Sequence, residues 1–371
     1  MSARIAAALL ALLLLLGGGA ILYHQQGRTQ KPAASGTLGQ PLLKGLKAAE
    51  IAAVVVREPK ATLTLERKEQ GWTIAERAGF PAELDKVRDF VLKMIELKIG
   101  QAEPLGAADR KRLNLDESGT RIEFRAADGK TLAQLVAGRK YFKSEPENPE
   151  KALGDGRFVL LPGSEASVYV VSDPLSQASA KSADWIAKTG FAAEKVRTLE
   201  VKFPDGQGWK IERARDDAGW KLAGAGRAGK LEITKANAAA YVLANVDLAD
   251  VLTKSAAPAD SGLDKPILIN AATFDGLSYA IKVGKLAGEN YYVSFSTSGT
   301  LDKTRAPEKN EKAADKDRRD KEFAERIKKI EERLPREKML SEYVLLVPKS
   351  LLEDTLRKRS ELLEKKEPKK K

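Results

Sequence analysis

The feature that most constrains the fold is an internal repeat. The stretch "LERKEQGWTIAE" (65–76) is matched by "IERARDDAGWKLAG" (211–224). Both run from an apolar residue through Glu and Arg to a polar turn, and then to a Gly-Trp pair that contains Trp72 or Trp220. The apolar and polar residues around these turns alternate, which predicts strands with one buried face. Two matching copies in one chain predict a duplicated domain.

Each copy continues with the same kinds of element. A helical stretch follows over 81–98 in the first copy and over 231–252 in the second. Paired strands come next, joined through an Asp-Gly at Asp128 and again at Asp275. Asp-Gly between alternating segments predicts a tight hairpin turn with positive φ at both central positions. We therefore interpret these aspartates as turn residues and not as metal ligands.

The spacing of later motifs locates an insertion in the second copy. Asp116, which ends "LNLD", and Asp264, which ends "SGLD", are as far apart as the two tryptophans. Tyr169 in "SVYVVSDPL" matches Tyr343 in "SEYVLLVPKSLL". Their separation exceeds that of the two tryptophans by roughly 26 to 28 residues. The second copy therefore carries extra chain, which we place at 303–338.

The insertion is predicted to contain a helix over 315–334 that ends at Pro335. Acidic and basic residues four apart support it, as in Asp315 with Arg319. Its apolar residues form one narrow stripe, made of Phe323, Ile327, Ile330 and Leu334. This stripe either packs on the helix's own domain or forms a docking surface for a partner, and these four residues are our candidate docking site.

The N-terminus predicts a membrane anchor. Residues 5–22, "IAAALLALLLLLGGGAIL", carry no charge and reach the lower limit for a spanning helix. A signal peptide cleaved after Ala20 is the alternative, although the apolar run continues beyond that residue. An anchor of this kind usually exports the domain behind it. We therefore expect a single-pass protein of the bacterial inner membrane, with most of the chain in the periplasm.

These observations together predict an α+β fold: an N-terminal transmembrane helix followed by two tandem repeats of a mostly antiparallel sheet with a packed helix. The expected division is an anchor over 1–24, a flexible linker over 25–48, repeats over 49–190 and 191–365, and a basic tail over 366–371.

Composition removes several kinds of chemistry. The chain has no cysteine, which excludes disulfides and thiolate sites, and only one histidine, His24. Ser179 and Ser182 flank Lys181, but we interpret this segment as a polar linker and not as a catalytic dyad. We expect no catalytic residue, no cofactor and no metal site, and hence no enzyme. The alternative is a glycan binder or hydrolase of the cell envelope, with carboxylates that meet only in space and tryptophans that stack on sugar.

A Gly-x-Gly-x-x-Gly pattern at 224–229 raises the possibility of a dinucleotide site, and Asp250 lies where a ribose-binding acid would stand. The first copy has "AERAGF" in this place, and no alternating βαβ series follows. We therefore predict a strand-to-helix loop. The net charge of +12 is spread among interleaved acids and bases, so we expect no nucleic-acid partner.

The anchor, the "GWTI" and "GWKL" strands, the "LNLD…DG…VAG" hairpin and the "YVV…P" and "YVLLVP" strands together resemble the bacterial domain of unknown function 4340. The resemblance covers roughly residues 50–360. It implies two copies behind a membrane segment and an association with ABC-type exporters of the gliding-motility type. It implies no catalytic residues. The expected function is therefore that of an extracytoplasmic accessory or scaffold protein, auxiliary to an ABC-type transporter complex.

Overall fold

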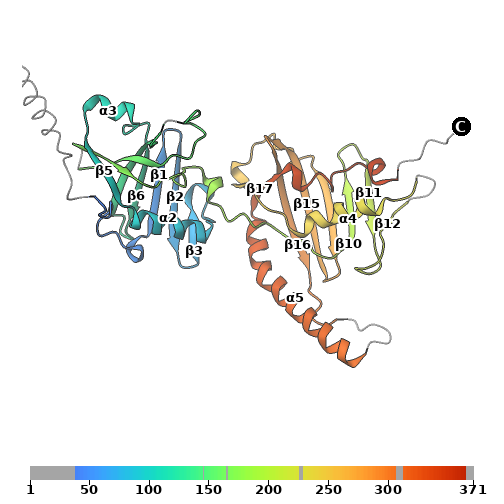
Figure 1. Ribbon diagram of the computed structural model, residues 1–371. Coiled ribbons are helices and arrows are strands. Elements are labelled where there is room, and N and C mark those ends of the chain that lie inside the picture. Colours follow the sequence, from blue (N-terminus) through green and yellow to red (C-terminus); the bar gives the residue numbers. More distant parts are fainter. Residues whose placement is uncertain (1–37, 145, 164–165, 225–228, 306–311, 365–371) are drawn as a thin grey trace, which may run out of the picture. The chain divides into compact units, whose positions relative to one another are not determined.

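The computed structural model describes residues 38–144, 146–163, 166–224, 229–305 and 312–364 (Figure 1). The chain divides into two compact units. The first contains the chain up to Glu76 together with Leu84–Lys181, and the second contains Arg77–Glu83 together with the chain from Ser182 onward. The predicted anchor and the basic tail from residue 366 lie outside the described residues. Among those residues, no helix has the length and apolar character needed to cross a membrane.

The first unit is built on an antiparallel sheet with strand order β3-β2-β1-β6-β7-β8-β9-β5. Its elements are β1 (Ala53–Glu58), β2 (Ala61–Lys68), β3 (Gly71–Ile74), α2 (Leu84–Glu96), β5 (Ile99–Pro104), α3 (Ala107–Arg112), β6 (Thr120–Arg125), β7 (Thr131–Tyr141), β8 (Gly156–Leu160) and β9 (Ser167–Val171). Helix α2 lies across one face of the sheet (Figure 1). It buries Phe90, whose ring stacks on Phe124 with centroids 6.4 Å apart.

The second unit repeats this arrangement with strand order β12-β11-β10-β14-β15-β16-β17-β13. Its elements are β4 (Phe80–Pro81), β10 (Val196–Lys202), β11 (Gly208–Glu212), β12 (Lys221–Leu222), α4 (Ile233–Tyr241), β13 (Asp250–Thr253), β14 (Ile267–Thr273), β15 (Leu277–Ala287), β16 (Asn290–Gly299), α5 (Ala313–Leu340) and β17 (Tyr343–Pro348). The eight strands from β3 to β5 correspond one to one, in the same order, with the eight strands from β12 to β13. The prediction of mostly antiparallel sheets with few helices is confirmed.

Short 3-10 helices join these elements in both units. They are η1 (Ala48–Glu50), η2 (Ala75–Arg77), η3 (Ser182–Asp184), η4 (Val242–Ala244), η5 (Lys254–Ala256), η6 (Lys349–Leu351) and η7 (Arg359–Leu362).

The repeated Glu-Arg…Gly-Trp motif is a cross-strand pair. In the first unit, Arg67 of β2 stands opposite Trp72 of β3. In the second unit, the guanidinium of Arg213 lies 4.6 Å from the centre of the Trp220 ring. A cation over an aromatic face and a directly opposed cross-strand pair each stabilise a hairpin. The motif therefore stabilises the corresponding hairpin in both units.

The repeated Gly of "VAG" marks a close crossing in the first unit. A Cβ at Gly138 would fall well inside contact distance of the Leu113 carbonyl oxygen, so only glycine fits there. The Arg139 amide donates to that same carbonyl at 2.7 Å. Asn114, the next residue of the crossing loop, has φ of 53°. The loop around "LNLD" therefore passes directly over strand β7, and we call this feature the crossover.

The second unit has its own crossover. A Cβ at Gly284 would meet the Ser261 carbonyl oxygen, and the Lys285 amide donates to that oxygen at 2.7 Å. Gly262 takes the place of Asn114, with φ of 77°. The two crossovers therefore have the same hydrogen bond and the same backbone conformation, although the sequences "LNLD" and "SGLD" differ.

The predicted turn type of the Asp-Gly hairpins is wrong. Gly129 (φ 84°) and Gly276 (φ 89°) have positive φ, whereas Asp128 and Asp275 do not. In the first hairpin, the pairing of β6 with β7 shifts register between Phe124 and Arg125, just before the turn. In each hairpin only the glycine adopts the left-handed conformation, so the turn is not the predicted one with two left-handed residues. The aspartates are still turn residues.

The predicted end of the inserted helix is also wrong, because α5 runs through Pro335 to Leu340. Proline removes one hydrogen bond inside a helix, at a cost of about 3 kcal/mol. The turn beyond it is anchored by Glu337 and Leu340, which are both fully buried. The Ser341 amide closes the helix by donating to the Glu337 carbonyl at 3.0 Å. Burial of this last turn offsets the cost of the proline.

Candidate functional site

The helix of each unit exposes large apolar side chains at equivalent positions. When Leu84 is placed on Ile233, the buried residues of α2 coincide with those of α4 and η4; these pairs are Val87 with Ala236, Phe90 with Ala239, Val91 with Ala240, and Met94 with Leu243. The outward residues then coincide as well. Leu84 and Leu92 are 55% and 44% exposed, and Ile233 and Tyr241 are 43% and 80% exposed. An amphipathic helix normally places polar residues on this outer face.

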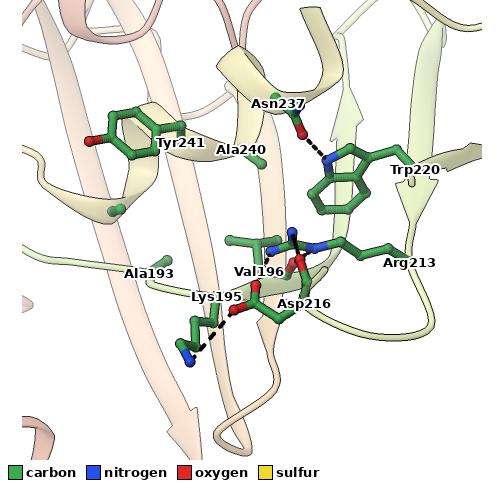
Figure 2. Close-up of a pocket in the computed structure, with 10 residues that line it drawn as sticks. Ala193, Lys195, Val196, Arg213, Asp216, Trp220, Asn237, Ala240 and Tyr241 are labelled. Carbon is green, nitrogen blue, oxygen red and sulfur yellow. Dashed lines mark hydrogen bonds and ion pairs between the residues drawn. The ribbon is translucent and has the colours of Figure 1, made fainter. Parts of the chain in front are cut away.

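A pocket of about 320 Å³ opens beside this face of α4 (Figure 2). We call it the helix pocket. It is lined by Ala193, Lys195, Val196, Arg213, Asp216, Trp220, Asn237, Ala240, Tyr241 and Ala244. Its size is at the lower end of the range for small-molecule sites and is suited to one or two side chains of a partner.

The charged wall of the helix pocket is internally paired. Arg213 Nη2 lies 2.7 Å from Asp216 Oδ1, and Arg213 Nε donates to the Val196 carbonyl at 2.8 Å. Lys195 Nζ lies 3.5 Å from the other carboxylate oxygen of Asp216. Two cations thus share one carboxylate, which leaves this wall with an excess of positive charge.

The aromatic wall is fixed from behind. Trp220 is only 5% exposed, and its Nε1 donates to Asn237 Oδ1 at 2.9 Å. Tyr241 stands on the opposite side and is largely in solvent (Figure 2). Between them the small side chains of Ala193, Ala240 and Ala244 line the space. The pocket therefore offers an apolar interior, an exposed aromatic side chain at its rim and a positive edge.

One backbone feature of the pocket is costly. Lys195 has φ of 48°, a conformation that costs a non-glycine residue about 1 kcal/mol or more. Its carbonyl accepts a hydrogen bond from the Phe274 amide at 3.0 Å, which holds the residue in place. The strained conformation places the Lys195 side chain at the pocket edge beside Asp216.

The arrangement of the helix pocket is suited to binding. Within the described part of the chain, no three His, Cys, Asp or Glu side chains lie close enough together to hold a metal ion. The carboxylate and the two cations of the helix pocket are occupied by one another. Tyr241 is 80% exposed, and the side chains of Lys195 and Asp216 are also partly exposed, at 38% and 45%. The apolar surface beside them could be covered by a partner side chain.

The sequence-predicted stripe of α5 lies inside the second unit. Phe323, Ile327 and Ile330 are between 2% and 8% exposed, and Leu334 is half-buried. Arg326, next to this stripe, pairs with the buried Asp275 of the hairpin turn at 2.8 Å. Phe323, Ile327 and Ile330 are therefore covered by the helix's own unit, whereas Leu334 keeps part of its side chain exposed.

A buried polar cluster fixes the C-terminal end of α5. The Glu337 carboxylate accepts hydrogen bonds from the Ala192 amide and the Tyr279 hydroxyl, both at 3.0 Å. It also forms an ion pair with Arg333 at 2.9 Å. Burial raises the pKa of Glu337 above its usual range. The pKa of Tyr279 is also raised, mainly by burial and secondly by the nearby charge of Glu337. The Tyr279 hydroxyl also lies 2.9 Å from the Ala192 carbonyl oxygen. These contacts tie α5 to the loop before β10.

The other sequence candidates have structural roles where they can be described. Most of the Gly-rich pattern, residues 225–228, lies outside the described residues. The strand before it, β12, is antiparallel to β11 and is not part of a parallel βαβ unit. The carboxylate of Asp250 receives two hydrogen bonds from Arg77, at 2.9 and 2.7 Å. Ser182 is buried, and the Ser179 hydroxyl accepts from the Lys181 amide at 3.1 Å.

The tryptophans mainly fill cores. Trp185, Trp209 and Trp220 are at most 5% exposed, and Trp72 is half-buried. Trp209 Nε1 donates to the Arg357 carbonyl at 2.8 Å. Buried rings have no free face on which a sugar could stack.

Sequence reasoning missed the outward residues of α2 and α4, although the signal was available. The repeat aligns Leu84 with Ile233 and Leu92 with Tyr241, so large apolar residues recur at positions that the helical period places outside the core. Comparing the two copies position by position would have found them.

A family model described as a domain of unknown function (DUF4340) matches residues 72–266, more than half of the chain. The chain belongs to the DUF4340 family. No match was found among curated proteins or among solved structures. The DUF4340 match begins at Trp72 and ends at residue 266, so it includes α2, α4, the helix pocket and the first crossover. Of the second crossover it includes Ser261 and Gly262 but not Gly284. Helix α5 lies beyond it. Both outward helix faces are thus part of the region that defines the DUF4340 match.

Proposed function

We propose that this protein is a non-catalytic binding component of a membrane complex. In this proposal, residues 1–24 hold it in the bacterial inner membrane, and the two units act outside the cytoplasm. The partner is a membrane protein, and the resemblance described above makes an ABC-type transporter the expected complex. The protein would act by binding this partner and thereby holding it in position.

The recurrence of exposed apolar residues on both helices carries this proposal. Single exposed hydrophobic residues are common and need no explanation. Here, however, the buried residues of the two helices have diverged, from Phe90 to Ala239 for example, while both outward positions have stayed large and apolar. Packing in the core does not account for it, because these side chains keep between 43% and 80% of their surface exposed. A shared use on the outer surface can.

The surroundings of these residues suit a protein partner. Next to Leu92 lies a shallow pocket with Lys93, Glu96 and Asp173, and next to Tyr241 lies the helix pocket with its Lys195–Asp216 edge. Protein interfaces combine an apolar or aromatic centre with a polar rim in this way. A partner that engages both units would present two similar contacts, one for each helix.

The test is co-purification of the full chain from detergent-solubilised membranes. Replacing Leu92 and Tyr241 by Ser should reduce recovery of the transporter subunits by about tenfold, because two central apolar contacts are lost. The matched control replaces Leu153 and Leu286 by Ser. These residues are 69% and 45% exposed and belong to the loop between β7 and β8 and to β15, not to a helix. If the helix variant retains its partner as well as the control does, the proposed docking surface is wrong.

A further inference from the structure

A second pocket, of about 560 Å³, lies beside the crossover of the first unit. We call it the crossover pocket. It is lined by Arg112, Asn114, Gly138, Arg139, Lys140, Phe142, Pro149, Glu150 and Arg157. Four of these nine residues are cationic and one is acidic. Such an excess is unusual in a chain whose acids and bases are otherwise interleaved.

Arg157 supplies the deepest of these charges. It is half-buried, its Nε donates to the Gly138 carbonyl, and its Nη1 donates to the Pro174 carbonyl at 3.3 Å. These neutral acceptors orient the guanidinium. The charge of Glu58 acts on it from a distance and forms no ion pair with it, so the charge is only partly balanced. Burial lowers the pKa of Arg157, yet an arginine side chain stays charged. A partly desolvated cation is unfavourable unless an anion joins it.

Two neighbours add to this charge. Lys140 Nζ donates to the backbone carbonyls of Glu150 and Ala152, at 2.9 and 2.6 Å, and Arg139 is exposed at the rim. In the described part of the chain, no ion pair joins Arg139, Lys140 or Arg157 to a carboxylate. Only the fourth cation, Arg112, has one, with Asp109 at 2.9 Å.

We propose that the crossover pocket binds a phosphate group. Guanidinium groups bind phosphate through paired, charge-assisted hydrogen bonds, and several cations around one space suit a dianion better than a single carboxylate. The volume also admits the group that the phosphate is attached to, beside Phe142 and Pro149. That group belongs either to a phospholipid headgroup or to a soluble phosphate ester. This inference is independent of the proposed docking function.

The second unit has a pocket of about 600 Å³ at its own crossover, beside Gly262, Gly284 and Lys285. Its charges are nearly balanced: Lys265, Lys285 and Lys358 face Asp205 and Asp264. Lys358 is already paired with Asp205 at 3.2 Å. Lys285 occupies the position of Arg139, so this unit provides a matched site that should bind phosphate weakly.

The experiment is isothermal titration calorimetry of the full chain in a neutral detergent, with inorganic phosphate as the probe. The variant Arg139→Gln should weaken binding by about tenfold, because it removes one charge-assisted contact at an exposed position. Lys285→Gln, the equivalent change in the second unit, should alter the affinity less than about twofold. Raising the salt concentration should weaken binding in the wild type, as expected of a charged site.

Arg157→Gln is the second variant and should abolish binding. Because Arg157 also bonds to two carbonyls, its thermal unfolding is measured alongside. Competition identifies the source: displacement by glycerophosphoglycerol, a phosphodiester, at the lower concentration indicates a lipid headgroup, and displacement by glucose 6-phosphate, a monoester, indicates a soluble ester. Either result supports a phosphate site. Absence of binding by the wild type, or equal affinity in wild type and Arg139→Gln, would overturn the inference.

Discussion

At the scale of single residues, Glu123 is the side chain on which the first unit's charge network depends. It accepts from Arg125 at 2.8 and 2.6 Å and from the Thr131 hydroxyl at 2.7 Å, and Arg57 lies 3.3 Å away. These contacts, led by the hydrogen bonds from Arg125, lower the pKa of Glu123 to about 2, against the opposing effect of burial. The carboxylate therefore links strands β1, β6 and β7 in its ionised form.

This lowered pKa predicts a pH dependence for Glu123→Gln. Because the folded state binds the proton less readily than the unfolded state, the stability that Glu123 contributes is present above about pH 4.5 and is lost as the pH falls toward 2. The free energy of unfolding of the wild type should therefore exceed that of the variant at pH 7, and the two should converge near pH 2. Urea unfolding at several pH values measures this difference. A gap that stays constant down to pH 2 would show that the ionised carboxylate is not its source.

The residues that line the crossover pocket could not be predicted from the sequence. Arg112, Arg139 and Arg157 come from α3, β7 and β8, and only the fold brings them together. Nothing in their spacing along the chain indicates a shared pocket. By contrast, the turn role of Asp128 follows from local chemistry, and its carboxylate indeed accepts from the Lys130 amide at 2.9 Å.

At the scale of elements, the repeat made most strands and both core helices predictable, because alternation and helical period are local properties. The end of α5 was not predictable in this way. Pro335 is a local signal for termination, but Glu337 and Leu340 are held by contacts with residues far away in sequence, such as Ala192 and Tyr279. Tertiary contacts there outweigh the local preference.

The burial of the α5 stripe predicts the effect of Ile327→Ser and Ile330→Ser. Each change removes a buried apolar side chain and leaves a hydroxyl in its place, so each should lower the free energy of unfolding by about 3 kcal/mol. Thermal unfolding of the full chain is the measurement. The control is Lys328→Ser on the exposed face of the same helix, which should have little effect. If both stripe variants unfold at the wild-type temperature, the stripe is not packed as described, and a docking role for it regains support.

At the scale of the whole molecule, two units share one strand order but differ in what their surfaces carry. The first has the cation-rich crossover pocket, and the second has the helix pocket and α5. Duplication followed by divergence of surfaces, with the sheet and the crossovers kept, gives one chain several different surfaces without changing its strand order. The proposed docking and phosphate sites lie on these diverged surfaces.

Membrane topology is the prediction that belongs to this scale. The charge on the two sides of residues 5–22 differs little, with Arg4 and the amino terminus on one side and Arg28 and Lys31 on the other, so the positive-inside rule gives only a weak preference. Since a short N-terminal anchor usually exports a large domain behind it, alkaline phosphatase fused after Lys371 should be active. Green fluorescent protein fused at the same residue should not fluoresce. N-terminal sequencing of the mature protein then separates an intact anchor from cleavage after Ala20. A fluorescent fusion with inactive phosphatase would place both units in the cytoplasm and would rule out an extracytoplasmic role.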